Sequence, residues 1–593
     1  MPRPRRPLGA RVGTLVRVLV GGLVGGLALA GCAAIPTSGP VSTGAPVPPP
    51  ERGLRFQPVS PPDGAAPLDV IRGFLLAASG VEDDHAFARA YLVPQAARSW
   101  RPGAGITVMV DGSAQATLEQ GGAVLAEDAR PAPDEPVTAT VSYEVAARVD
   151  ANGRLTVAAP GTRDEVGYRL EQTSGQWRIA DLPDGLVVDE AGFDLAFTPH
   201  QLYWVDATGG YLVPETRWFA ERRAIATSIV TELLRGPSPW LAPAVSTGFP
   251  PGTALTRPPA VPVVGGEARV DLTRAALDAG AQERALMQAQ LQATLRPVPA
   301  VATVRVTVEG GEFVLPDSLP ALVRDPGAES VAVAASPDGL VEVRGGTVRP
   351  VEDLPVTEGL TLTDPARSTA AYAALDADRT RLLYLVPGTA EPEELLTGTD
   401  LLAPSIDPHG WVWTTPRVST GLLPVARPGG EVVEVSAPWL SGRRVSSLRV
   451  ARDGARVLLA TVDPSGAHRV ELASVERTGD GRPLSLTRAS GASLDPTLVA
   501  VSEVAWTGEA SAAVLGRRAG EDVDRVYLAD PLGAPTEPLV PLPEDVPVVS
   551  LAAGSTPRAV VIGSADGRLW QRAGAQWVPV PADVPLSDPA FAG

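Results

Sequence analysis

The chain has 593 residues, of which 44% are hydrophobic, and it contains 60 glycines and 61 prolines. This length exceeds what one hydrophobic core covers, so we expect several domains, and the many turn-forming residues favour short strands over long helices. The formal net charge of −18 argues against nucleic-acid binding, which needs a basic surface, and the single cysteine excludes an intrachain disulfide framework and a cysteine-based zinc cluster.

Residues 1–31 are predicted to be a signal peptide. Residues 18–30 are uncharged and apolar, and arginines precede them (Arg3, Arg5, Arg6, Arg11 and Arg17). As a helix this stretch spans about 20 Å, less than the ~30 Å core of a bilayer. A longer membrane-spanning anchor, extended back through Arg17 and Thr14, is the alternative.

The only cysteine, Cys32, ends this segment. Leu29, Ala30, Gly31 and Cys32 resemble a bacterial lipobox, in which small residues permit cleavage and a thiolate accepts a diacylglyceryl group. Each buried acyl CH₂ contributes about 0.8 kcal/mol and one chain binds only marginally, so two or three acyl chains are needed for stable anchoring. Cys32 is therefore the predicted lipid attachment site, on the outer face of the cell membrane. A fortuitous buried cysteine is the alternative.

Two regions follow the predicted cleavage site. Residues 32–66 are rich in proline, glycine and serine and predict an extended tether. Residues 67–190 predict an α+β domain: helices over 67–98, with Pro67 in a first turn and Asp83 or Asp84 as the N-cap of a second helix, then strands from Gly105 onwards. Asn152-Gly153 indicates a hairpin. A curved sheet around a helix often holds a pocket, but no group of residues identifies a ligand.

Residues 191–318 predict a second α+β unit. A strand hairpin is followed by a helix at about 219–235, short strands, a second helix at about 281–295 and an alternating strand. The order LYWVD, YLVPETR, ELLRGP, ARVDL and VATVRVTV resembles the GerMN module of exported bacterial proteins. This resemblance implies a fold and not an active site.

Residues 319–593 repeat one plan six times: an apolar strand enters a polar turn and leaves as a second apolar strand. The repeats are VAVAASPDGLVEV, AALDADRTRLLYL, APSIDPHGWVWTT, LRVARDGARVLLA, EVAWTGEASAAVL and SLAAGSTPRAVVI. Their spacing of roughly 30–55 residues is in the range of propeller blades. We therefore expect an all-β propeller of six or seven blades. A pair of β-sandwiches is the alternative.

Residues that could carry chemistry are scattered. His85, His200, His409 and His468 lack metal-ligand spacing, and we find no nucleophile elbow, Walker loop or dinucleotide fingerprint. Four aspartates could suggest calcium, but their positions in hairpin turns favour hydrogen bonds to their own backbone (Asp338, Asp378, Asp407 and Asp453). The sequence predicts no enzyme, metal or cofactor.

Tryptophans could form a sugar- or peptide-binding platform on the propeller, although packing between blades is the simpler interpretation. The residues concerned are Trp411, Trp413, Trp506, Trp570 and Trp577. Trp218 and Trp240, in the second unit, are open to both interpretations. Exposed tryptophans would favour glycan binding.

Taken together, the lipobox, IPTSGPV at residues 35–41, RGFL at 72–75, the GerMN-like unit and the propeller-like region resemble the actinobacterial LpqB lipoprotein family over nearly the whole chain. The resemblance implies an accessory lipoprotein that binds the extracytoplasmic domain of a sensor histidine kinase of the MtrB type and modulates signalling in cell-wall and division control. The alternative is a wall-glycan-binding or wall-modifying protein with a pocket in the first domain. Converging carboxylates would favour that enzyme, and a purely apolar pocket would favour the binding protein.

Overall fold

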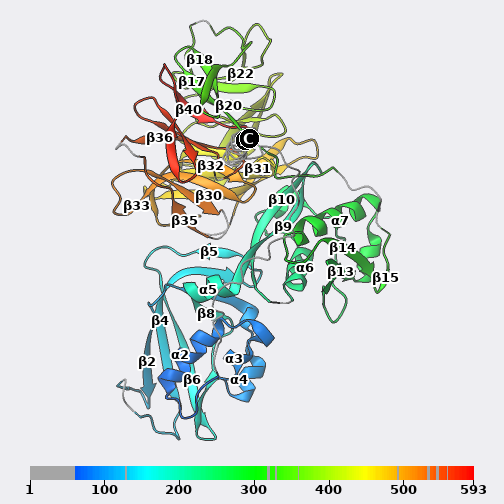
Figure 1. The fold of residues 1–593 in the computed structure, drawn as a ribbon, viewed down its shortest axis with the longest axis vertical. Coiled ribbons are helices and arrows are strands. Elements are labelled where there is room, and N and C mark those ends of the chain that lie inside the picture. Colours follow the sequence, from blue (N-terminus) through cyan, green and yellow to red (C-terminus); the bar gives the residue numbers. More distant parts are fainter. Residues whose placement is uncertain are drawn as a thin grey trace, which may run out of the picture. The chain divides into compact units, whose positions relative to one another are not determined.

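The computed structural model describes residues 60–593 apart from 127–129, 223, 315, 317–320, 328, 329, 358, 490–492, 531–533, 543–545, 557 and 593. The predicted signal peptide, Cys32 and most of the tether lie outside the described residues. Two α+β regions are followed by a ring of small β-sheets (Figure 1). The predicted fold class, α+β, α+β of the GerMN type and an all-β propeller, is confirmed.

The first region combines short helices with an eight-stranded sheet. Its helices are α2 Pro67–Ala78, η1 Glu82–Asp84, α3 Ala86–Arg89, α4 Pro94–Ser99, η2 Pro102–Ala104 and α5 Glu190–Ala196. Its strands are β1 Gly105–Met109, β2 Gln115–Gln120, β3 Ala123–Val124, β4 Val137–Asp150, β5 Leu155–Val157, β6 Arg163–Thr173, β7 Gln176–Asp181 and β8 Leu186–Asp189. The long strand β4 organises the sheet, because β1, β2, β5 and β6 all pair with it.

Helix α2 supplies the centre of this region's core. Pro67 occupies its first turn as predicted, and Leu68, Ile71 and Phe74 are buried on the face that packs against β4, β7 and β8 (Figure 1). The predicted aspartate N-cap is wrong: α3 starts after His85, with no side-chain cap. Asp84 lies in a left-handed turn and instead accepts a hydrogen bond from Arg89 at 2.7 Å.

The hairpin predicted at Asn152-Gly153 joins β4 to β5. Gly153 has φ +80°, a conformation in which a side chain is strained. A Cβ atom there would also lie 2.7 Å from the carbonyl oxygen of Trp218 in the next region. The glycine is thus required both by the turn and by a close approach between two regions.

The second region contains two four-stranded sheets, in the orders β11-β9-β10-β16 and β12-β13-β14-β15. Its strands are β9 Phe197–Asp206, β10 Tyr211–Ala220, β11 Val245–Ser246, β12 Val263–Val264, β13 Glu267–Leu272, β14 Thr303–Val308, β15 Gly311–Glu312 and β16 Val323–Arg324. Its helices are α6 Ile225–Arg235, η3 Ala242–Ala244, η4 Arg274–Asp278 and α7 Ala281–Leu295.

One of the two predicted helices has the predicted bounds, and the other begins later than predicted. Helix α7 is confirmed, and the Glu283 carboxylate accepts the backbone N–H of Gly280 at its start (2.7 Å). Helix α6 begins later than the predicted residue 219. The reason is that β10 pairs with β9 from Leu212 with Val205 as far as Ala220 with Phe197, so the backbone of residues 219 and 220 belongs to the sheet.

The third region is a propeller of six blades of four strands each among the described residues, and the third and fourth blades are joined by one pairing of β27 with β31, Ser436 with Ser485. The blades are, in order, β40 with β17, β18 and β19; β20–β23; β24–β27; β28–β31; β32–β35; and β36–β39. The first three blades consist of β17 Val331–Ser336, β18 Gly339–Arg344, β19 Thr347–Pro350, β20 Leu362–Arg367, β21 Tyr372–Asp376, β22 Arg381–Leu385, β23 Glu393–Thr397, β24 Ser405–Ile406, β25 Val412–Trp413, β26 Leu422–Arg427 and β27 Glu431–Ser436. The other three blades consist of β28 Arg444–Val450, β29 Arg456–Val462, β30 His468–Arg477, β31 Pro483–Arg488, β32 Leu498–Gly508, β33 Ser511–Arg518, β34 Arg525–Asp530, β35 Ala534–Pro538, β36 Val548–Ala553, β37 Val560–Ser564, β38 Leu569–Ala573 and β39 Gln576–Pro579. The last strand, β40 Ser587–Ala590, completes the first blade. A short helix, η5 Pro438–Leu440, precedes β28.

The ring closes through its last strand. β40, from the end of the chain, pairs with β17, from the start of the propeller. The innermost strands of neighbouring blades contact one another all the way round, in the order β20, β24, β28, β32, β36 and β40. Six blades therefore satisfy the predicted six or seven, and the alternative of two sandwiches is wrong.

Candidate functional site

The predicted lipid attachment site cannot be placed, because Cys32 lies outside the described residues. It therefore stays a prediction. In the part of the chain that the structure describes, no helix is both long and apolar enough to cross a bilayer.

The four histidines occupy separate places. His85 is buried beside Trp100 and lies 3.2 Å from the carbonyl oxygen of Ala78. His200 is on β9, while His409 and His468 are in two blades of the propeller. Among residues 60–593, within the described ranges, no group of three or more histidine, cysteine, aspartate or glutamate residues is arranged to hold a metal ion.

Two of the four turn aspartates bind their own turns as predicted. Asp407 accepts the backbone N–H groups of His409 and Trp411, both at 2.9 Å, and Asp453 accepts that of Ala455 at 2.9 Å. In the second blade the turn-forming residue is Asp376, which accepts the N–H of Thr380 at 2.7 Å. Asp378 lies in the same turn, two residues further on, but accepts none of these hydrogen bonds, so the predicted backbone hydrogen bond of Asp378 is wrong. Asp338 is exposed in its turn.

The propeller tryptophans are packed inside the blades. The five predicted candidates are between 0% and 8% exposed (Trp411, Trp413, Trp506, Trp570 and Trp577). Several donate their indole N–H to neighbouring groups, as Trp413 does to Asp407 at 2.8 Å and Trp506 to the carbonyl of Arg449 at 3.0 Å. The packing interpretation is thus confirmed for these residues. Trp240 is also buried, and Trp218 packs against Phe193.

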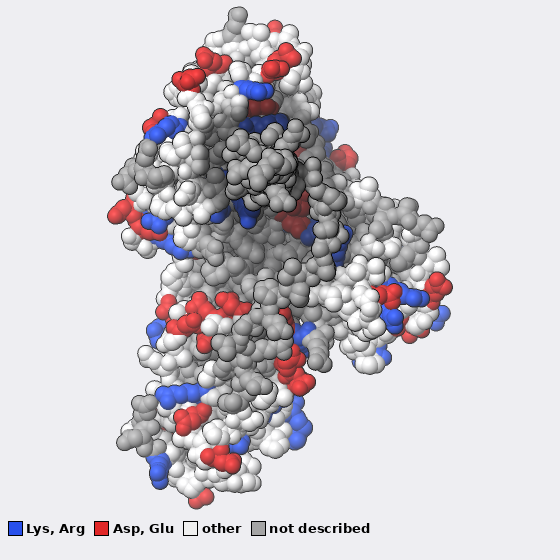
Figure 2. Space-filling view, viewed as in Figure 1, with Lys and Arg blue, Asp and Glu red and all other residues white. Residues whose placement is uncertain are grey.

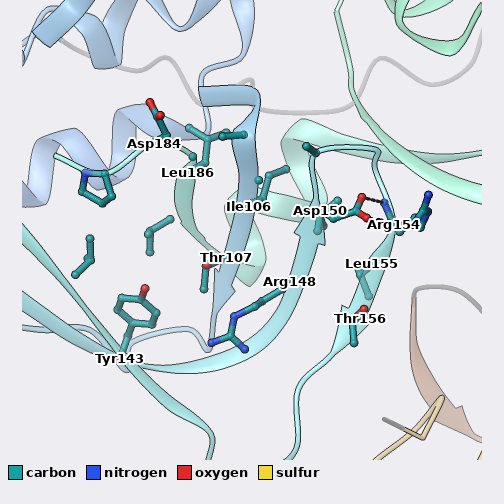
Figure 3. Close-up of a pocket in the computed structure, with 18 of the residues that line it drawn as sticks. Ile106, Thr107, Tyr143, Arg148, Asp150, Arg154, Leu155, Thr156, Asp184 and Leu186 are labelled. Carbon is teal, nitrogen blue, oxygen red and sulfur yellow. Dashed lines mark hydrogen bonds and ion pairs between the residues drawn. The ribbon is translucent and has the colours of Figure 1, made fainter. Parts of the chain in front are cut away.

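A half-open cavity of about 570 Å³ lies against the first region (Figure 3). Thr107 of β1, Arg148 of β4 and Thr156 of β5 line it, and they are direct neighbours across the three strands. Residues that pair directly project from the same face of a sheet, so these three side chains form one polar row. Asp150 and Arg154, at the hairpin, lie beside that row, with a 3.6 Å ion pair between them (Figure 3). Glu215 and Trp240 of the second region and Ala489 of the propeller complete the lining.

Tyr143 also lines the cavity. Burial raises the pKa of its hydroxyl to about 12, with Asp164 acting in the same direction and Arg148 against it. The hydroxyl is therefore neutral under physiological conditions and can donate a hydrogen bond.

Two carboxylates of the cavity are already neutralised. Asp184 accepts hydrogen bonds from the backbone N–H and Nε of Arg101, at 2.8 and 2.9 Å, and Arg101 holds its pKa below the ordinary value. Glu215 is buried and pairs with Arg217 at 3.1 Å and with the hydroxyl of Ser238. The lining is consequently neither purely apolar, as expected for the binding protein, nor a converging pair of free carboxylates, as expected for the wall-modifying enzyme.

The second region is joined to the propeller by a partly buried polar network. The Tyr203 hydroxyl donates to Glu509 at 2.7 Å, and Arg324 pairs with the same carboxylate at 2.8 Å. Arg456 lies over the Trp506 ring and donates to the backbone carbonyl of Glu509. These contacts reach the turns at one end of the blades.

The first region is joined to the second through the β4–β5 hairpin. The N–H of Trp218 donates to the carbonyl of Gly153 at 2.7 Å, and the buried Arg217 donates to the carbonyl of Asn152 at 3.2 Å. The described molecule is thus a chain of three domains held together by specific polar contacts, with the cavity beside one junction. The fold is that of a multidomain protein with two α+β regions followed by a β-propeller.

Comparison with known proteins gives the family. A model described as "Lipoprotein LpqB, N-terminal domain" matches residues 60–194, one described as "Sporulation and spore germination" matches 201–313, and one described as "Lipoprotein LpqB beta-propeller domain" matches 338–592. Lipoprotein LpqB of Streptomyces coelicolor is 32% identical, with 87% of each chain covered, and that of Thermobifida fusca is 26% identical, with 92% of this chain and 95% of the relative covered. TolB from Acinetobacter baumannii is a solved structure with 16% identity and a TM-score of 0.30, covering 45% of this chain and 68% of its own.

The chain belongs to the LpqB lipoprotein family, and it is accordingly a membrane-anchored lipoprotein. The LpqB and GerMN resemblances are confirmed. A pocket in the first domain was expected, but its lining residues were not identified from the sequence, although one signal was present: the Asn152-Gly153 turn fixes the register that places Thr156 opposite Arg148. No local pattern brings Thr107 to the same row.

Proposed function

We propose that this lipoprotein is held by acyl chains on Cys32 at the outer face of the cell membrane, binds the extracytoplasmic domain of a sensor histidine kinase of the MtrB type, and modulates its signalling without catalysing a reaction. The family resemblance supports the kinase. The observation that carries the binding role is the charge on one face of the propeller.

That face, called here the outer-loop face, is formed by the loops between the second and third strands of each blade and by the loops that lead to the next blade. The described residues of this face include twelve carboxylates and only four arginines. The carboxylates are Asp338, Glu352, Asp353, Asp378, Asp400, Asp463, Asp495, Glu521, Asp522, Asp524, Asp566 and Asp583, and the arginines are Arg379, Arg417, Arg443 and Arg568. The loops at the opposite end of the blades are nearly balanced in charge, and it is there that the second region is bound.

The imbalance persists after ion pairing. Each of the four arginines is already in an ion pair, with Asp364, Asp400, Glu471 and Asp566 respectively. By contrast, six exposed carboxylates of the outer-loop face take part in no ion pair among the described residues (Asp338, Glu352, Asp353, Asp378, Asp522 and Asp583). Paired charges are also widespread elsewhere: on the side drawn in Figure 2, many red carboxylates lie beside blue arginines. The outer-loop face therefore fits a partner surface rich in arginine and lysine, and complementary charge speeds encounter with such a partner.

A lipid anchor adds to this attraction. Two proteins confined to one membrane meet at high effective concentration, so a weak interface is enough for regulation. A propeller suits this role because its rigid blades present many loops on one broad face.

The test is photo-crosslinking in native membranes from a probe on the outer-loop face. The wild-type chain is expected to capture the kinase, and Cys32→Ala, which removes the anchor, to lose the capture. Changing Asp338, Asp378 and Asp583 together to lysine should weaken capture, whereas Glu391→Lys, an exposed carboxylate at the opposite end of the blades, should not. Capture of a different membrane protein, or capture unaffected by the triple change, would contradict the proposal.

A further inference from the structure

The cavity beside the β4–β5 hairpin is a feature to which the proposed function gives no role. Its volume of about 570 Å³ lies within the range of about 300–1,000 Å³ typical of sites for small organic ligands. Its polar row offers hydroxyls on both sides of a guanidinium, from Thr107, Arg148 and Thr156.

Both arginines of the cavity have hydrogen-bond donors to spare. Among the described residues, Arg148 donates a single hydrogen bond, from Nη2 to Asp164 at 2.9 Å, although a guanidinium carries five N–H groups. The Nε of Arg154 is buried without a hydrogen-bond partner in the described structure, and it lies 3.9 Å from a carboxylate oxygen of Glu215. Unused donors beside two hydroxyls suit a carboxylate, which guanidinium groups bind through paired hydrogen bonds.

The remaining charges indicate a second group on the ligand. With Asp184 and Glu215 neutralised by Arg101 and Arg217, the carboxylate beside the polar row is Asp150, which lies 3.6 Å from Arg154. Glu165 also belongs to the lining, but it is exposed and pairs with Ser142, further along β4 from Asp150. A simple anion would meet the Asp150 carboxylate and be repelled, whereas a zwitterion matches both signs.

We propose that this cavity binds a small zwitterion of the amino-acid type, either a free amino acid or a short peptide. Its carboxylate is held by Arg148 with the hydroxyls of Thr107 and Thr156, and its ammonium group faces Asp150, two residues along β4 from Arg148. Because the lining also includes Glu215 and Trp240 of the second region, an occupant touches two regions at once.

The test is isothermal titration calorimetry with the full acylated chain in lipid nanodiscs, using alanine, alanyl-alanine, propionate and ethylamine as probes. Binding of alanine or of the dipeptide, with propionate and ethylamine at least about tenfold weaker, supports the zwitterion, since each of these two probes lacks one of the charged groups that form hydrogen bonds. The stronger of the two zwitterions identifies the source as a free amino acid or a peptide.

Variants locate the site. Arg148→Gln should weaken binding about ten- to a hundredfold, because it removes the charged donor, and Arg148→Lys should restore part of it. Thr107→Val with Thr156→Val keeps the strand shape and should also weaken binding. Arg163→Gln, an exposed arginine of the same sheet that does not line the cavity, is the matched control. Absence of binding by either zwitterion, equal binding of propionate, or unchanged binding by Arg148→Gln would overturn the proposal.

Discussion

Asp407 is expected to be one of the most sensitive positions in the propeller. It is 4% exposed. One carboxylate oxygen accepts two backbone N–H groups of its own turn, and the other accepts Trp413 Nε1 at 2.8 Å and Arg477 Nη2 at 2.6 Å. Arg477 belongs to β30 in the next blade and is also buried, so the pair connects two blades.

Asp407→Ala leaves the Arg477 cation buried without its carboxylate and removes the acceptor of three other donors. Breaking a buried pair on one side costs about 3–5 kcal/mol. Since a multidomain chain does not unfold in one step, the cost is best measured locally, as the opening free energy of the β24 and β25 amides in hydrogen exchange. The double variant Asp407→Ala, Arg477→Met should lose less opening free energy than Asp407→Ala alone, because no unpaired charge remains in the interior.

The matched control is Asp378→Ala, an exposed aspartate in the turn of another blade, which should change the exchange little. A loss of opening free energy below about 1 kcal/mol in Asp407→Ala would refute the reasoning, since substitutions of surface residues cost that little. Calcium that slows exchange in the wild type and not in Asp407→Ala would refute it differently, by showing that the turn binds metal.

Three other changes test other parts of the fold. Gly153→Ala should destabilise the junction between the first two regions by about 1–3 kcal/mol, because φ is +80° and the new Cβ would lie against the carbonyl oxygen of Trp218. Faster proteolysis at the hairpin would report this change, and unchanged proteolysis would contradict it. Burial lowers the pKa of His409 below 6.5, so the unfolded chain binds a proton more readily and stability should fall as the pH drops below 6.5; His409→Phe should flatten that dependence in thermal unfolding. Deleting residues 587–593 removes β40, so exchange in β17 should accelerate strongly, and an unaltered exchange pattern would show that the ring closes in another way.

Much of the fold follows from local sequence signals. The Asn152-Gly153 hairpin, helix α7 and the six strand–turn–strand repeats are set by residues adjacent in the chain, and each is found where the sequence indicates. Helix α6 shows the limit of such signals, because the residues before it pair with β9 and become strand.

The features missed depend on residues far apart in sequence. Ring closure brings β40 against β17, and the Tyr203–Glu509 hydrogen bond joins residues 306 positions apart. The cavity is similar, since Thr107 reaches Arg148 only through the pairing of β1 with β4. Tertiary register sets these contacts, and no periodicity within a segment encodes it.

The claim that most of the account depends on is attachment to the membrane through the only cysteine. Mass spectrometry of the mature protein from its native membrane tests it directly. The account predicts a chain that starts at Cys32 and carries a diacylglyceryl group on its sulfur, with a further acyl chain on the new amino group where three chains are present. A mature chain that starts at another residue, or a Cys32 without acyl groups, would contradict it.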